Sequence, residues 1–113
     1  MTANLLALVL AATFGVHGTL MIFAAPMMRA GAASVGFSVT QYRYIGMLEV
    51  AAAIGLVASL VIPILGMAAG VGLLLLMTAA VIVHYRNGDP LLRMVPATVL
   101  GSIALFYIAL LLR

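Results

Sequence analysis

The residues best suited to chemistry in this chain are one carboxylate and two imidazoles. Glu49 lies inside a long apolar stretch, YRYIGMLEVAAAIGLVASLVIP, where no nearby loop or terminus explains its charge. A carboxylate at that depth in a bilayer costs a few kcal/mol or more, so it is usually paired, protonated or directed into a cavity. His17 lies in the middle of another apolar stretch, and His84 lies near the end of a third. Imidazole titrates near neutral pH, which makes these three residues the candidates for acid–base catalysis.

Each of these residues has more than one interpretation. Glu49 can act as a general base or nucleophile with His17 or His84 as its acid partner. His17 can instead be a structural residue that bonds a neighbour such as Thr13, Ser102 or Glu49. His84 can anchor a helix end at the membrane surface, or carry protons between the cytoplasm and Glu49.

A metal site is a weak alternative. Two imidazoles and one carboxylate could ligate a metal, but they lie on three different segments with no pair three or four residues apart to support it. The chain has no cysteine, which removes disulfides, CxxC redox pairs and iron–sulfur ligation. The sequence therefore predicts no metal site.

The composition is that of an integral membrane protein. Of its 113 residues 67% are hydrophobic and only 6% are charged, with a mean hydropathy of +1.37. A soluble domain carries about a quarter charged residues, so this chain has too few to cover a water-facing surface. The five arginines are dispersed rather than clustered, so we expect no nucleic-acid partner.

The hydrophobic pattern predicts an all-α protein, a single domain over residues 1–113. A helix needs about 20 apolar residues to cross a bilayer. Four stretches qualify, so we expect a four-helix transmembrane bundle with short loops. The predicted spans are 3–25, 42–62, 64–85 and 94–112.

The boundaries between spans have physical causes. Residues 26–41 form a polar, glycine-containing stretch that predicts a loop, and Pro63 predicts a tight turn between antiparallel neighbours. Pro96 is expected in the first turn of the fourth helix, where proline is tolerated. Small residues four apart, such as Gly66 and Gly70, are expected to let helices pack closely within the bundle. The N-terminal stretch lacks a basic start and a small-x-small cleavage site, so we interpret it as a retained first span.

Charge sets the expected orientation. Connectivity puts the loops at 26–41 and 86–93 on one face, together with Arg29, Arg43, Arg86 and Arg93. The positive-inside rule places those loops in the cytoplasm and both termini outside, and we expect the bacterial cytoplasmic membrane.

Depth along the helices predicts a polar layer. A rise of about 1.5 Å per residue puts Glu49 roughly 10 Å inside the loop-side boundary. His17, Thr78 and Ser102 fall at the same depth on the other three spans. Small residues beside Glu49 leave room for a pocket, and they equally suit close helix packing. The expected lining residues are Gly46, Ala53, Met77, Thr78, Ser102 and Tyr42.

Short motifs resemble the DoxX-like family of small four-helix membrane proteins. They are Gly46-Met47-Leu48-Glu49 in the second span, the turn at Pro63, and the stretch Ala79-Ala80-Val81-Ile82-Val83-His84 before Asn87-Gly88-Asp89-Pro90. The resemblance marks Gly46, Glu49 and His84 as motif positions. Family members often carry a lysine after a glycine in the first span. Here Gly18 is followed by Thr-Leu-Met, and His17 is the nearest titratable group.

Three functions stay open. The resemblance implies a subunit of an oxidoreductase assembly, with quinone as a candidate cofactor and a lipophilic small molecule as ligand. The acid–base residues alternatively suit a membrane-embedded enzyme that opens an epoxide, isomerises or cyclises a lipophilic substrate. The third alternative is a non-catalytic scaffold or assembly factor. The uniformly apolar outer faces suit contact with lipid and are compatible with a homo-oligomer or a partner membrane subunit.

Overall fold

The computed structural model describes residues 2–113, and these form five helices and no strand. The helices are α1 (Thr2–Ile22), α2 (Pro26–Ser34), α3 (Val39–Ala58), α4 (Ile64–Arg86) and α5 (Leu91–Leu111). The prediction of an all-helical protein is therefore confirmed. Four of the helices are long and one, α2, is short.

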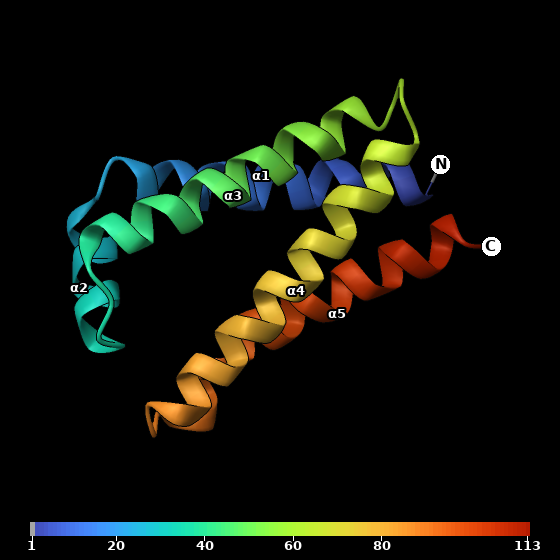
Figure 1. Ribbon diagram of the computed structural model, residues 1–113. Coiled ribbons are helices and arrows are strands. Elements are labelled where there is room, and N and C mark those ends of the chain that lie inside the picture. Colours follow the sequence, from blue (N-terminus) through green and yellow to red (C-terminus); the bar gives the residue numbers. More distant parts are fainter. Residues whose placement is uncertain (1) are drawn as a thin grey trace.

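The long helices form two antiparallel pairs that open like a V (Figure 1). One pair is α1 with α3, and the other is α4 with α5. The pairs meet at the end that holds the two chain termini and the turn around Pro63. They separate toward the other end, where α2 lies opposite the turn between α4 and α5 (Figure 1). The four long helices are thus packed together at one end and separated at the other.

The hydrophobic core fills the closed end of the V. Its large members include Leu10, Phe14, Leu56, Leu73 and Tyr107, each no more than 2% exposed. The Tyr107 ring packs against the glycine face of α4, because a Cβ added to Gly70 would lie 3.2 Å from Cδ2 of that ring. Small residues on α4 therefore serve packing within the chain, as the sequence predicts.

The stretch predicted as one polar loop contains α2, so that prediction is wrong for residues 26–34. α1 ends where Ala24 takes a positive φ of 52°, and Pro26 occupies the first turn of α2. Proline is well suited there because its missing N–H would have no helical partner. The Arg29 Nε group donates to the Ala24 carbonyl at 2.9 Å, which ties α2 back to the turn.

The ends of α3 and α5 also differ from the predicted ones. Ser38 and Gln41 form a capping box, with Gln41 N–H donating to Ser38 Oγ at 3.0 Å, so α3 begins before Tyr42. α5 begins at Leu91, which puts Pro96 inside the helix rather than in its first turn. A proline in that position cannot donate to the carbonyl four residues earlier.

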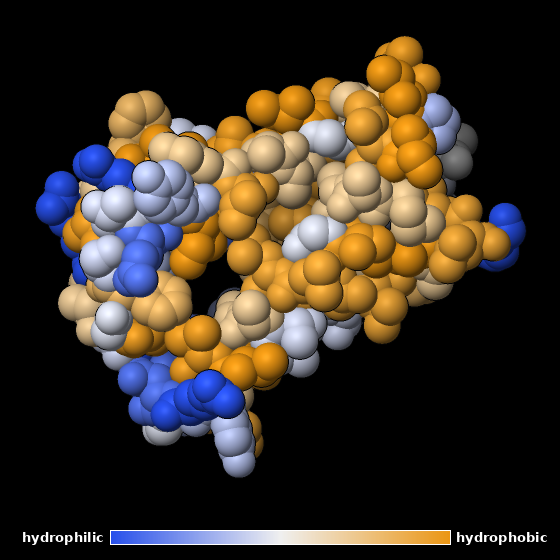
Figure 2. Space-filling view, viewed as in Figure 1, coloured by the Kyte–Doolittle hydropathy of each residue, from blue (hydrophilic) through white to orange (hydrophobic). Residues whose placement is uncertain are grey.

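Three of the helices are long and apolar enough to cross a membrane: α1, α4 and α5. The expected fourth span is not confirmed, because α3 is not apolar enough along its length to count as a membrane-spanning helix. Its first turns carry Gln41 and Arg43, and its centre carries Glu49. Apolar side chains nevertheless cover the outer surface of the long helices, and Figure 2 shows them as a broad hydrophobic band with hydrophilic residues gathered around α2 and the α4–α5 turn. A multi-pass membrane protein is the class that this fold defines.

Candidate functional site

Glu49 is paired with His17 across the contact between α3 and α1. The His17 Nδ1 and Glu49 Oε1 atoms are 2.7 Å apart, and one proton lies in the bond between them. The glutamate side chain is only 3% exposed, whereas the imidazole is 48% exposed. The histidine therefore satisfies the buried carboxylate and presents the rest of its ring outside the helix contact.

Both residues line a cavity of about 830 Å³ between the two helix pairs. Figure 2 shows the molecule hollowed between α3 and α4, next to α2. All five helices contribute to the wall, and most of the lining side chains are apolar. A volume between about 300 and 1,000 Å³ is usual for small-molecule sites. The polar lining residues are Thr13, His17, Tyr42, Glu49, His84 and Arg93.

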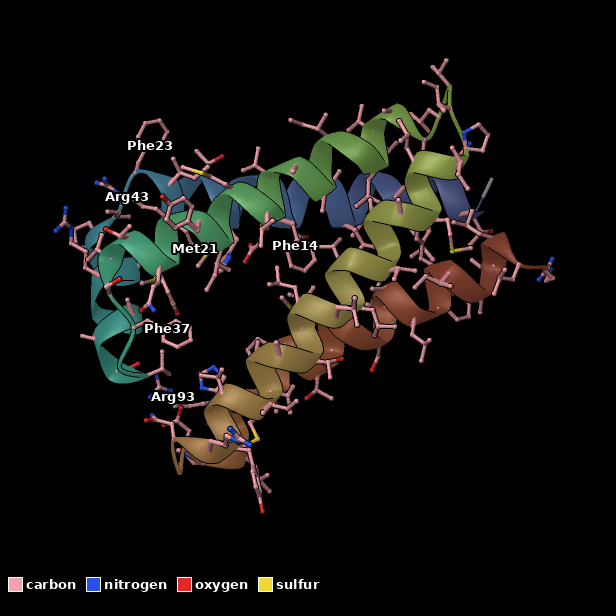
Figure 3. The ribbon with its side chains drawn as sticks, viewed as in Figure 1. Phe14, Met21, Phe23, Phe37, Arg43 and Arg93 are labelled. Atoms are coloured by element: carbon pink, nitrogen blue, oxygen red, sulfur yellow. The ribbon has the colours of Figure 1, made fainter. Side chains whose placement is uncertain are left out.

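Aromatic side chains of the α1–α3 arm line this space. Figure 3 shows Phe14 reaching toward α4 and Phe37 pointing inward from the segment before α3. The Phe37 ring meets the Tyr42 ring edge-on, with centroids 6.2 Å apart. Flat apolar rings around one polar pair are suited to a planar or hydrocarbon ligand with a single hydrogen-bonding group.

His84 belongs to a second histidine–carboxylate pair on the loop side of the cavity. Its Nδ1 lies 2.6 Å from Asp89 Oδ2, across the turn between α4 and α5. Arg93 NH1 lies 3.5 Å from the other carboxylate oxygen of Asp89. The hydrogen bond with His84, helped by Asn87 and Arg93, holds the pKa of the Asp89 carboxyl below its ordinary value. His84 is thus a polar group on the loop side of the cavity and does not bond Glu49.

The same turn is tied to α2. The Asn87 Nδ2 group donates to the Ser34 carbonyl at 2.9 Å, and Arg93 NH2 donates to Ser34 Oγ at 3.0 Å. These bonds join the two arms of the V at their separated ends. The loop side of the cavity is therefore bridged by polar contacts.

Not all of the expected lining residues reach the cavity. Thr78 and Ser102 are exposed and donate to carbonyls of their own helices, Leu74 O at 2.8 Å and Thr98 O at 2.8 Å. Neither hydroxyl contributes to the cavity wall that holds Glu49 and His17. Gly46 and Ala53 pack between α3 and α1 instead of lining the wall, whereas Tyr42 and Met77 do line it.

Most residues that line the cavity were not predicted from sequence, and Phe14, Phe37 and Arg93 are the notable ones among them. Arg93 had a usable signal, because it follows Asp89 by four residues on the far side of a turn. The two phenylalanines gave none, since one more aromatic side chain in an apolar chain is unremarkable. Within residues 2–113, no three His, Asp or Glu side chains come close enough together to hold a metal ion.

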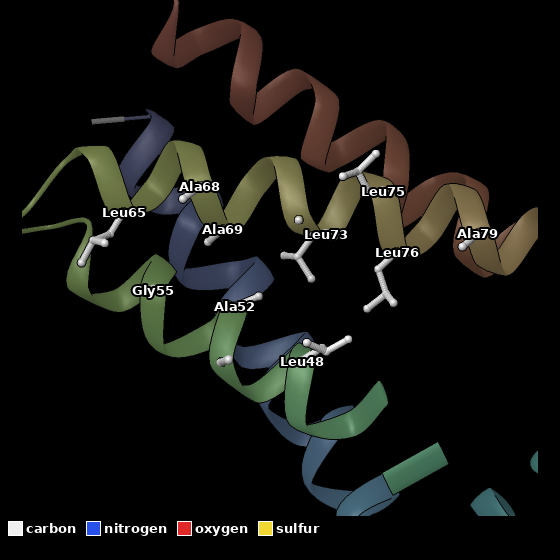
Figure 4. Close-up of a pocket in the computed structure, with 12 residues that line it drawn as sticks. Leu48, Ala52, Gly55, Leu65, Ala68, Ala69, Leu73, Leu75, Leu76 and Ala79 are labelled. Carbon is white, nitrogen blue, oxygen red and sulfur yellow. The ribbon is translucent and has the colours of Figure 1, made fainter. Parts of the chain in front are cut away.

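A second hollow, of about 610 Å³, follows the outer contact of α3 with α4. Its wall is made of leucines, alanines and glycines (Figure 4), and neither His17 nor Glu49 is among the residues that line it. A groove without a titratable or hydrogen-bonding side chain cannot perform acid–base chemistry. The inner cavity is therefore the candidate site.

Comparison with known proteins shows the family of this chain. The protein belongs to the DoxX-like family, whose sequence pattern matches residues 5–107, nearly the whole chain. Neither the curated proteins nor the solved structures include a significant match. The family match and the three long apolar helices together describe a small multi-pass membrane protein.

Proposed function

We propose that this protein binds a lipophilic small molecule in its inner cavity, with a polar group of that ligand at the His17–Glu49 pair. The observation that carries the proposal is a hydrogen-bonded imidazole and carboxylate in the wall of an otherwise largely apolar cavity. Small-molecule sites commonly combine an apolar lining with a few polar groups that orient the ligand. A quinone is the first candidate, because its ring suits Phe14 and Tyr42 and its oxygens suit His17.

The protein partner in this proposal is an oxidoreductase assembly, of which this chain would be a subunit. The chain has no cysteine of its own, so any thiol or iron–sulfur step would belong to another subunit. A bound quinone would supply two-electron redox chemistry. The residues of this chain would hold its head group and offer or accept a proton at the His17 imidazole.

The proposal includes a fourth membrane crossing by α3. This helix pairs along its length with α1, which itself is long and apolar enough to span (Figure 1). Its one mid-helix charge is buried and paired, so Glu49 does not face lipid. With four crossings, the arginine-bearing end of the V faces the cytoplasm by the positive-inside rule, and both termini lie outside.

Binding of decylubiquinone to the purified protein in lipid nanodiscs tests this function. We expect saturable binding to the wild type and a loss of affinity of about tenfold or more in Glu49→Gln, because the carboxylate that orients the His17 imidazole is lost. Ser102→Ala is the matched control, since its hydroxyl lies on an outer face. Wild-type protein that binds no quinone, or equal affinity in Glu49→Gln, would contradict the proposal.

A second candidate function is acid–base catalysis on a lipophilic substrate, such as epoxide opening, isomerisation or cyclisation. The favouring observation is that Glu49 holds Nδ1 of His17 while nearly half of the imidazole stays exposed. A carboxylate that orients a histidine is a recurrent arrangement in general-base catalysis. Turnover of a lipophilic epoxide that vanishes in His17→Gln but persists in Ser102→Ala would favour this function. If Glu49→Gln changes only thermal stability, the pair is structural and the chain is a scaffold.

A further inference from the structure

The outer groove and the inner cavity share part of one wall. Leu76 and Ala79 of α4 line both hollows, so the groove and the cavity adjoin at these two side chains. We propose that the gap between α3 and α4 at Leu48 and Leu76 is a lateral opening, through which the lipophilic ligand passes between the bilayer and the His17–Glu49 pair. This inference rests on the proposed binding function and adds the route to the site.

The two helices separate progressively along the groove. Near the Pro63 turn they touch, since a Cβ added to Gly55 would lie 3.2 Å from the Ala69 Cβ. Farther along, Figure 4 shows Leu48 and Leu76 projecting into the space between α3 and α4 from opposite sides. Flexible leucine side chains are then the barrier, whereas the backbones block passage nearer the turn.

The rim of the opening matches a hydrocarbon environment. The groove is lined by Leu, Ala and Gly only, and the Leu48 side chain is 61% exposed. Such a surface contacts lipid chains without the desolvation of any polar group. A lipophilic ligand moving along it stays in apolar surroundings until its polar group reaches His17.

The alternative route through the loop side is obstructed. Ser34 is bonded to both Asn87 and Arg93 there, and the His84–Asp89 pair stands beside them. A ligand passing this way would have to break several hydrogen bonds and cross a charged rim. Burying or disrupting such groups costs free energy that the lateral path avoids.

A reversible crosslink across the gap tests the route. The chain has no cysteine, so Leu48→Cys with Leu76→Cys places the only two thiols on opposite sides of the opening. A short bis-methanethiosulfonate reagent would join them, and a reductant would release them. Binding of tritiated decylubiquinone in nanodiscs would then be followed in time. The two single-cysteine variants, treated with the same reagent, control for added bulk.

We expect the crosslink to slow both association and dissociation of decylubiquinone by about tenfold or more, with reduction restoring the rates. The dissociation constant should stay near that of the uncrosslinked variant, since a blocked passage changes rates and leaves bound-state contacts intact. Unchanged rates in the crosslinked protein, together with faster rates in Asn87→Ala, would place the route at the loop side and overturn the inference. Wild-type protein that binds no decylubiquinone would instead overturn the proposed function.

Discussion

Gly18 of α1 and Gly46 of α3 bring the two backbones into direct contact beside the His17–Glu49 pair. A Cβ added to either glycine would lie 2.7 Å from the carbonyl oxygen of the other. The neighbouring side chains can therefore meet only because both positions lack a side chain. Gly46, which the family resemblance marks beside Glu49, thus acts on the site through helix spacing.

The first prediction concerns this contact. Gly46→Ala should force α1 and α3 apart, because the added methyl group would also lie 2.7 Å from the Met21 Cβ. Overpacking of this kind costs about 1–3 kcal/mol. We expect a lower unfolding temperature in detergent and weaker binding of decylubiquinone, measured by thermal denaturation and titration.

Gly72→Ala is the control for that change. Gly72 lies in a helix, and a Cβ added there meets nothing within 4 Å. Alanine is the better helix former by up to about 1 kcal/mol in soluble helices, so stability should be unchanged or slightly raised. Equal effects of the two substitutions would show that the Gly18–Gly46 contact has no special role.

The second prediction separates the two partners of the buried pair. His17→Leu leaves the carboxylate of Glu49 without its partner, and a buried group left unsatisfied costs about 1–3 kcal/mol, or more if charged. Glu49→Gln keeps a neutral group that can still bond the imidazole. Thermal unfolding in detergent should therefore show a larger loss for His17→Leu than for Glu49→Gln. The reverse order would mean that Glu49 has another stabilising partner.

The third prediction is a pH dependence of stability that arises at Asp89, on the loop side of the cavity. The pKa of Asp89 is lowered from its ordinary value of 3.8, chiefly by the hydrogen bond with His84. A lowered folded-state pKa means that the unfolded chain binds the proton more tightly. The stabilisation is therefore complete above the ordinary pKa and is lost as the pH falls through the folded-state pKa.

Asp89→Asn removes that effect and provides the measurement. The wild type should unfold at a higher temperature than Asp89→Asn near pH 7, and the difference should shrink below about pH 4. Ser102→Ala, which changes no titrating group, should show a difference from wild type that does not vary with pH. A gap between wild type and Asp89→Asn that widens on acidification would contradict this account.

The fourth prediction tests the proposed orientation of the four crossings. Leu91 near the α4–α5 turn is 79% exposed, and Leu112 near the C-terminus is 74% exposed. In a chain without native cysteine, Leu91→Cys and Leu112→Cys each place one accessible thiol at one end of the V. In intact cells a membrane-impermeant maleimide should label Leu112→Cys alone, and disrupted cells should label both. Labelling of both variants in intact cells, or of Leu91→Cys alone, would be incompatible with this orientation.

The membrane class and the positions of the long helices follow from the sequence because they depend on composition along the chain. Apolar stretches of about 20 residues and breaks at Pro63 and Pro90 are visible without any contact. Depth counting also placed His17 level with Glu49, because the rise per residue is nearly constant in every helix. The structure then shows those two side chains hydrogen-bonded at 2.7 Å.

Only tertiary packing decides which face of each helix points toward the interior. A helix that is apolar all round carries no stripe to mark its inner face. Thr78 and Ser102 therefore shared a depth with Glu49 in the sequence, yet they point outward in the structure. The V-shaped cavity likewise arises from how the two helix pairs meet and diverge. Rise along a helix is local, whereas rotation and separation depend on contacts between residues far apart in the chain.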